Sequence, residues 1–215
     1  MVCNIFDRGS VALLHTVLNT GGPVKIVMIS GKQGSGKTTT ADALTNHIGL
    51  TVPGMLLYRI RFAQPIYDIH DAVLAKLALY GIRRDVVKDG PLLQLIGSDY
   101  GRKVIDPDIW VHCLQNWVSK YVLEPSKSVV IIDDLRFRNE FAAFSDAVTV
   151  RLECSVDIRR ERCSMWRPND THISEVDLDE YVEQGRFSAV LNTGEVGVTE
   201  CVAKICSLMF QQEGK

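Results

Sequence analysis

The segment from Gly31 to Thr38, GKQGSGKT, constrains the fold of this chain more than any other part of the sequence. It follows an apolar run at residues 25–30 that is rich in β-branched residues and is typical of a strand buried on both faces of a parallel sheet. Residues 38–50 then carry apolar side chains at helical spacing. A strand, a glycine-rich loop and a helix in this order predict an α/β fold built around a phosphate-binding loop.

The loop has the pattern G-x-x-x-x-G-K-[ST], which has a direct physical use. Glycines let successive backbone N–H groups turn inward around phosphate oxygens, and the N-terminal dipole of the following helix adds positive potential there. Lys37 would bridge the β- and γ-phosphates of ATP, and the Thr38 hydroxyl would ligate Mg²⁺. We therefore predict an ATP site whose nucleotide-binding residues are Gly31, Gln33, Gly34, Ser35, Gly36, Lys37, Thr38 and Thr39.

Strand-like and helix-like segments alternate along the rest of the chain. This alternation predicts a five-stranded parallel sheet with helices on both faces, in three layers. Asp106-Pro107 resembles a helix start, and the helix after it carries an apolar stripe that includes Trp110. The remaining strands are expected at 56–61, 128–134, 147–152 and 188–191, and helices at 1–23, 65–80, 91–104, 137–144 and the C-terminal end.

Composition and charge exclude several classes of protein. A chain of 215 residues with 46% apolar residues is long enough for one well-buried domain. A net charge of -2 provides no global basic field, so nucleic acid is not an expected partner. No apolar run has the length of a membrane span or of a signal-peptide core, and the six cysteines form no C-x-x-C pair. These observations predict a cytoplasmic protein with reduced thiols.

An acidic pair, Asp133-Asp134, ends the predicted strand at 128–134. A phosphate-binding loop needs a carboxylate on a neighbouring strand to hold the metal and its water shell, and Asp133 is the first choice for that role. The alternative is that the pair only caps the next turn. Neither Asn-Lys-x-Asp nor Asp-x-x-Gly, the GTPase signals, is found in the expected context, and the chain is short for a motor or helicase ATPase. A small-molecule kinase fits best.

An arginine-rich segment follows the predicted strand at 147–152. Five of the fourteen arginines lie between residues 151 and 167. A mobile lid over ATP would use such arginines to neutralise charge on the transferred phosphoryl group. Arg160 and Arg167 are the predicted catalytic arginines of this lid, whereas helical spacing turns some of the others outward. A solvated helix face is the alternative. Ser174 is expected to cap a short helix.

Four sequence blocks together resemble the phage-type deoxynucleoside monophosphate kinases. They are FAQP at 62–65, LLQLIGSDYGR at 92–102, DDLRFRNE at 133–140 and HISE at 172–175, and the resemblance spans residues 24 to 195. The patterns Asp-x-Arg-x-x-x-Glu and Gln-x-x-Gly-x-x-x-x-Arg are more specific than the phosphate-binding loop. The resemblance implies a P-loop nucleoside monophosphate kinase-like fold and the reaction of ATP with a dNMP to give ADP and dNDP.

The resemblance also implies an acceptor site. It places Arg102 and Arg136 at the acceptor monophosphate, where guanidinium groups can bind a phosphate through two hydrogen bonds. The implied reaction needs no general base, because a phosphate monoester is already largely deprotonated at neutral pH. Arg136 and Lys37 are the catalytic residues outside the lid, and the substrate-binding residues are Phe62, Gln94, Arg102, Asp134, Arg136 and Glu140.

The chain is expected to be one kinase domain with several parts, of which the first is predicted from helical spacing and the others from the resemblance. Residues 1–23 form an N-terminal helical extension, about 62–105 an acceptor-binding arm and about 155–186 the lid. The extension has no counterpart that we can assign, so a role in packing or in a homodimer is left open. Several relatives have Asp directly after the loop lysine, where this chain has Thr38.

Two alternative functions are kept. The first is a related kinase for phosphomevalonate, dephospho-CoA or a ribonucleotide. The second is an ATP-binding regulatory module without turnover. If the chain is phage-encoded, it is expected to serve deoxynucleotide biosynthesis in the cytoplasm of the host cell.

Overall fold

A computed structural model describes residues 22–83, 88–164, 166 and 172–210. Residues 1–21 of the expected N-terminal extension and the lid residue Arg167 lie outside this part of the chain. The described residues divide into two compact units, one made of residues up to Ile60 and from Tyr121 onward, and the other of Arg61–Lys120. They are called the sheet unit and the helical unit below. The helical unit contains the whole of the expected acceptor-binding arm, 62–105.

The sheet unit is built on five parallel strands in the order β2-β3-β1-β4-β5. They are β1 (Lys25–Gly31), β2 (Leu56–Ile60), β3 (Ser128–Leu135), β4 (Val148–Glu153) and β5 (Ala189–Asn192). Every strand pair is parallel, so the chain crosses over between strands through helices. The five-stranded parallel sheet predicted from the sequence is confirmed, with strand boundaries within about two residues.

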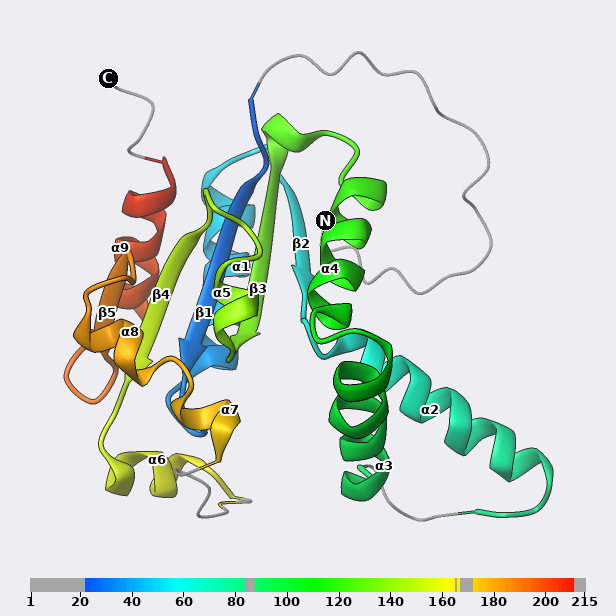
Figure 1. Cartoon of the computed structure of the whole chain (residues 1–215). Coiled ribbons are helices and arrows are strands. Elements are labelled where there is room, and N and C mark those ends of the chain that lie inside the picture. The colour runs from blue at the N-terminus through cyan, green and yellow to red at the C-terminus, as the bar shows by residue number, and fades with distance from the viewer. Residues whose placement is uncertain (1–21, 84–87, 165, 167–171, 211–215) are drawn as a thin grey trace. The chain divides into compact units, whose positions relative to one another are not determined.

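Two helices of the sheet unit pack against each other over the strands. They are α1 (Lys37–Thr51) and α9 (Val198–Phe210), and their buried side chains join those of β1, β3 and β4 in one apolar core. Figure 1 shows α1 behind the sheet and the one-turn helix α5 (Arg138–Phe141) in front of it. The central strands β1 and β3 are buried almost throughout, which explains why their sequences are continuous apolar runs.

The lid region follows β4 and contains three short helices. These are α6 (Val156–Arg162), α7 (Ile173–Val176) and α8 (Asp179–Glu183). A 3₁₀ turn, η2 (Pro125–Lys127), precedes β3. The helix cap predicted at Ser174 lies instead on His172, whose Nδ1 accepts a hydrogen bond from the Ser174 N–H at 3.2 Å.

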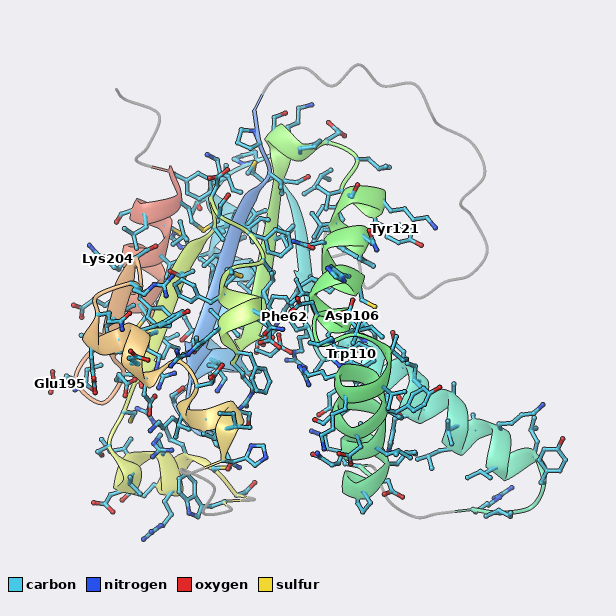
Figure 2. All side chains as sticks on the ribbon, viewed as in Figure 1. Phe62, Asp106, Trp110, Tyr121, Glu195 and Lys204 are labelled. Carbon is cyan, nitrogen blue, oxygen red and sulfur yellow. The ribbon has the colours of Figure 1, made fainter. Side chains whose placement is uncertain are left out.

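The helical unit contains α2 (Gln64–Leu79), α3 (Gly90–Gln94), the π-helix η1 (Leu95–Ile105) and most of α4 (Ile109–Tyr121). The helix expected over 91–104 is confirmed in extent, but beyond Gln94 it is a π-helix. Within this π-helix, Gly101 lies so close to the indole of Trp110 that a Cβ atom there would be 2.6 Å from Trp110 Cζ2. Trp110 is buried, as predicted for the apolar stripe, and its Nε1 donates to the Gly97 carbonyl at 2.8 Å (Figure 2).

The predicted start of α4 is also two residues too early. Asp106 Oδ1 accepts a hydrogen bond from the Asp108 N–H at 2.9 Å, so the aspartate closes a turn and the helix begins at Ile109. Among the described residues, no helix combines the length and the apolar character that crossing a membrane would require.

Candidate active site

The carboxyl ends of β1, β3 and β4 carry most of the polar residues of the sheet unit that the sequence singled out. Because the strands are parallel, the loops that follow them leave the sheet at the same edge. The phosphate-binding loop follows β1, Asp133 and Asp134 lie at the end of β3, and the lid region follows β4. The fold thus places one candidate site at this edge.

Two glycines of the loop are fixed by close backbone approaches. Gly34 has φ +80°, and a Cβ atom on it would lie 2.6 Å from the carbonyl oxygen of Arg159. Gly31 has φ +150°, and its Cβ would lie 2.6 Å from the carbonyl oxygen of Leu152 in β4. The loop therefore packs tightly against the start of the lid region, and only glycine fits at these two positions.

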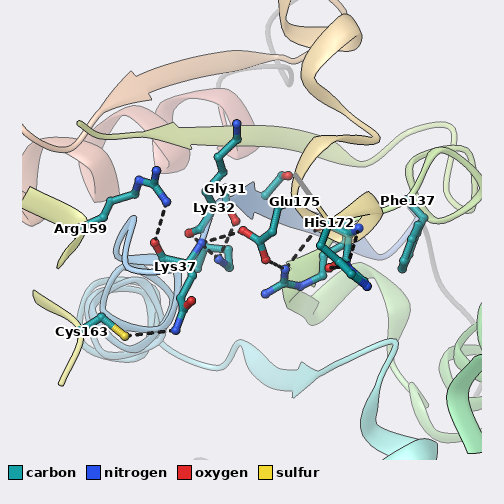
Figure 3. A network of polar contacts seen from close by, with 12 residues as sticks. Gly31, Lys32, Lys37, Phe137, Arg159, Cys163, His172 and Glu175 are labelled. Atoms are coloured by element: carbon teal, nitrogen blue, oxygen red, sulfur yellow. Dashed lines mark hydrogen bonds and ion pairs between the residues drawn. The ribbon is translucent and has the colours of Figure 1, made fainter. Parts of the chain in front are cut away.

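Lys37 is the first residue of α1 and folds back over the loop. Its Nζ donates to the carbonyl oxygens of Gly31 at 2.6 Å and Lys32 at 3.0 Å (Figure 3). The pKa of Lys37 is lowered to about 7, mainly by burial and also by the positive charges of Arg136 and Arg151, while the carboxylates of Glu175 and Asp133 act in the opposite direction. Cationic groups outweigh anionic ones around this amine, which suits a phosphate-binding site.

Arg136 lies directly after β3, on a turn that Glu140 holds in place. The Glu140 carboxylate is buried and accepts hydrogen bonds from the N–H groups of Arg136 at 2.9 Å and Phe137 at 3.1 Å. The Arg136 guanidinium donates to the Ser174 carbonyl at 3.3 Å and to the Glu175 carboxylate. The structure thus gives Glu140, an expected substrate-binding residue, a role in presenting Arg136.

The candidate metal residues meet the donor chemistry of Mg²⁺. Thr38 is exposed in the first turn of α1, and Asp133 is buried with its carboxylate paired to Arg59 of β2. The described residues contain no group of three or more His, Cys, Asp or Glu side chains that could hold a metal by themselves. Mg²⁺ usually takes only one or two protein ligands, with phosphate and water oxygens completing its coordination. One hydroxyl and one carboxylate therefore fit a metal that arrives with a nucleotide.

The arginines of α6 differ in what they contact. Arg159 is buried, donates to the Gln33 carbonyl at 3.2 Å and stacks on the Trp166 ring at 5.2 Å. Arg162 donates to Thr193 Oγ1 at 3.1 Å and to its carbonyl at 2.9 Å. Arg160, the predicted catalytic arginine, is exposed. Successive helical residues are rotated by about 100°, so α6 cannot turn all three arginines toward the loop.

A pocket of about 580 Å³ lies beside the loop, on the side of α9. The sequence singled out the loop residues that line it but not its other walls, which come from segments far apart in the chain. It is lined by loop residues, by Arg162 of the lid region and by the segment after β5, including Thr193, Val196, Gly197 and Val198. Its volume is in the range of small-molecule sites.

Residues 27–183 match the family model described as AAA domain. The chain belongs to this AAA domain family. Among curated proteins there is no significant match. Solved structures that resemble the chain include shikimate kinase from Acinetobacter baumannii in complex with shikimate, with a TM-score of 0.52 and 11% identity over 89% of this chain and 96% of that one. TT1252 from Thermus thermophilus has a TM-score of 0.55 and 17% identity over 90% of this chain and 100% of that one. The fold of this AAA domain protein is thus P-loop nucleoside monophosphate kinase-like.

The remaining predicted site residues of this AAA domain protein fall in different units. Asp134 is half-buried beside Asp133 in the sheet unit. Phe62, Gln94 and Arg102 belong to the helical unit. There Phe62 is buried, Gln94 is exposed at the end of α3, and Arg102 Nη1 donates to the Gly97 carbonyl at 3.2 Å.

Proposed function

We propose that the chain is an ATP- and Mg²⁺-dependent kinase that transfers the γ-phosphoryl group of ATP to a deoxynucleoside monophosphate. The observation that carries the proposal is the position of Arg136. Its guanidinium donates to the Glu175 carboxylate, which also accepts from the Gln33 N–H of the loop, and its positive charge lowers the pKa of the loop lysine Lys37. Two cations that follow different strands therefore lie at one site. A loop lysine alone would suit any nucleoside triphosphatase. A second cation here suits transfer to an acceptor that itself carries a phosphate group.

The donor half of the site accommodates ATP in three parts. The loop from Gly31 to Thr39 binds the phosphates through its N–H groups and Lys37. The 580 Å³ pocket beside Thr193 and Val196 receives the base and ribose. Thr38 and Asp133 hold Mg²⁺ and its water shell, and the ion neutralises charge on the phosphates when it is bound.

The transfer itself depends on positioning and charge. An oxygen of the acceptor monophosphate forms a bond to the γ-phosphorus, and the bond from that phosphorus to the bridging oxygen of ADP breaks. The acceptor needs no base because a phosphate monoester has its second pKa near 6 and is mostly a dianion at neutral pH. Lys37 and Arg136 stabilise the charge that spreads over the transferred group, and the lid arginines Arg160 and Arg167 are proposed to join them.

The acceptor half rests on the resemblance to deoxynucleoside monophosphate kinases. Arg136 and Arg102 are proposed to bind the acceptor phosphate, and Phe62 and Gln94 to contact its nucleoside. The contact of Glu140 with the Arg136 backbone supports this reading of the Asp-x-Arg-x-x-x-Glu pattern. The buried Glu140 carboxylate fixes the turn, and the turn holds Arg136 in the position that phosphate recognition needs.

A coupled assay of ADP release tests the proposal. The protein is incubated with Mg-ATP and each of the common dNMPs, and at least one is expected to stimulate ADP release above the rate without acceptor. Lys37→Met is expected to lower kcat/KM by at least about a hundredfold. Lys32→Met is the matched control, because Lys32 belongs to the same loop but pairs with Asp179 at 2.9 Å, and its activity should stay within about threefold.

The same assay separates the alternatives. Stimulation only by a ribonucleotide, phosphomevalonate or dephospho-CoA would contradict the dNMP assignment and leave a P-loop kinase. ATP binding that is lost in Lys37→Met, without phosphoryl transfer to any acceptor, would identify a regulatory module instead.

A further inference from the structure

The carboxylate of Glu175 lies within the phosphate site, although Glu175 belongs to the lid helix α7. Its side chain is only 4% exposed. One carboxylate oxygen accepts a hydrogen bond from the Gln33 N–H of the loop at 2.9 Å, and the other accepts from the Arg136 guanidinium (Figure 3). Its negative charge also acts on Lys37, whose pKa it raises. A loop N–H, an arginine and the loop lysine are the groups that a phosphate would use.

The segment that carries Glu175 is joined to α5 on its C-terminal side. Within the segment, the Glu175 N–H donates to the His172 carbonyl at 2.8 Å and closes the first turn of α7. On its C-terminal side, the Arg138 N–H donates to Asp177 Oδ2 at 2.9 Å. The Glu175 carboxylate is therefore a buried group with a defined position beside the loop, and not an exposed side chain that reaches it by chance.

A carboxylate and a terminal phosphate cannot share these partners. Two anions about 4 Å apart repel strongly where water is partly excluded. The γ-phosphate needs Lys37 and gains from Arg136, whereas Arg136 now donates to Glu175, whose negative charge also acts on Lys37. A bound triphosphate must therefore either lose these contacts or expel the carboxylate.

We infer that Glu175 is a placeholder for the terminal phosphate of ATP, holding Gln33 and Arg136 in place in the nucleotide-free chain and leaving when a triphosphate binds. Its departure frees Arg136 from the lid, so that the arginine can face an acceptor only after ATP has entered. The placeholder itself requires only ATP binding. The release of Arg136 for an acceptor rests on the proposed function.

Calorimetric titration of the full chain with a non-hydrolysable Mg-ATP analogue and with Mg-ADP tests the inference. Glu175→Gln keeps the size and an acceptor oxygen but removes the charge that opposes the γ-phosphate. The variant is expected to bind the ATP analogue about tenfold more tightly than the parent protein, with ADP affinity changed by less than about threefold.

Glu180→Gln is the matched control. Glu180 is also a carboxylate in the lid region and also pairs with an arginine, Arg138 at 2.6 Å, but its side chain is 51% exposed. The affinity of Glu180→Gln for both nucleotides should equal that of the parent protein. Glu175→Ala provides a second variant, and thermal melts of each confirm that it is folded. Glu175→Ala is also expected to bind the ATP analogue more tightly than the parent protein does.

Unchanged or weaker binding of the ATP analogue by folded Glu175→Gln or Glu175→Ala would overturn the inference, since Glu175 would then stay beside the bound nucleotide. An equal gain in affinity for ADP and for the ATP analogue would also overturn the inference, because the carboxylate would then not occupy the position of the γ-phosphate. No acceptor is present in these titrations, so their outcome is independent of whether any dNMP is phosphorylated.

Discussion

The protonation of one loop residue, Lys37, determines how nucleotide binding should depend on pH. The pKa of Lys37 is lowered to about 7 in the nucleotide-free chain, mainly by burial, with Arg136 as the next cause. Phosphate groups would raise this pKa, because the ammonium form is the one that they attract. Above pH 7 the free chain therefore holds mostly the neutral amine and must take up a proton when ATP binds.

The expected result is weaker ATP binding at higher pH. Between pH 7 and 8 the affinity should fall by about fivefold, with uptake of about 0.9 proton per ATP at pH 8, where ATP itself no longer titrates. Titrations in two buffers of different ionisation enthalpy measure the uptake, and Lys37→Met serves as the control that should lack it. Proton release, or no proton exchange, at pH 8 would show that the Lys37 amine is already charged in the free chain.

At the scale of elements, the buried parallel strands were the most predictable part of the fold. Residues 25–30 and 128–134 are continuous apolar runs because both faces of β1 and β3 are covered, and this requirement is visible in the sequence alone. The π-helix η1 was not predictable in this way. It contains a close contact between Gly101 and Trp110, nine residues further along, and helical periodicity does not record such packing.

The contact of η1 with Trp110 leads to a stability prediction. Gly101→Ala should lower the free energy of unfolding by about 1–3 kcal/mol, because the new methyl group would meet the Trp110 ring at 2.6 Å and the Ile96 carbonyl at 2.5 Å. Gly90→Ala, in the same unit, is the control, since no other group lies within 4 Å of a Cβ there. Urea unfolding of the full chain measures both, and equal free energies for the two variants would show that η1 relaxes around the methyl group.

Helix α6 shows how much of the candidate site the sequence could predict. An arginine-rich lid was expected, but the arginine that faces a given group depends on where the helix starts, and Ser155 at its N-cap fixes that start. Arg159 and Arg162 consequently meet Gln33 and Thr193. The wall of the 580 Å³ pocket at residues 193–201 was missed for a similar reason, since it meets the loop only in the folded chain.

A pair of arginine variants tests this view of α6. Arg162→Ala should weaken ATP binding by about three- to tenfold, because Arg162 lines the pocket beside Thr193. Arg160→Ala should leave ATP affinity unchanged, since Arg160 does not line the pocket. Nucleotide titrations measure the affinities, and kcat is measured alongside. A loss of kcat in Arg160→Ala at normal ATP affinity would support the predicted catalytic role of Arg160, whereas equal ATP affinity in both variants would contradict the nucleotide assignment of the pocket.

For the molecule as a whole, the proposed reaction assigns ATP to the sheet unit alone and divides the residues for the acceptor between the two units. Every group proposed to bind ATP belongs to the sheet unit, whereas Phe62, Gln94 and Arg102 belong to the helical unit. If the helical unit serves only the acceptor, changes there should alter the kinetics of one substrate and not of the other. The separation of the two substrates is therefore testable by steady-state kinetics.

Arg102→Ala is expected to raise the KM for the best dNMP by at least about tenfold, while the KM for ATP changes by less than about twofold. Loss of one charge-assisted phosphate contact has about this cost. The matched control is Arg83→Ala, an exposed arginine of the same unit, which should leave both values unchanged. The two KM values are measured by varying each substrate at saturating levels of the other. Equal rises in both would point to a general loss of structure, which a thermal melt would reveal. An unchanged KM for every dNMP would remove Arg102 from the acceptor site and leave Arg136 as the proposed phosphate ligand.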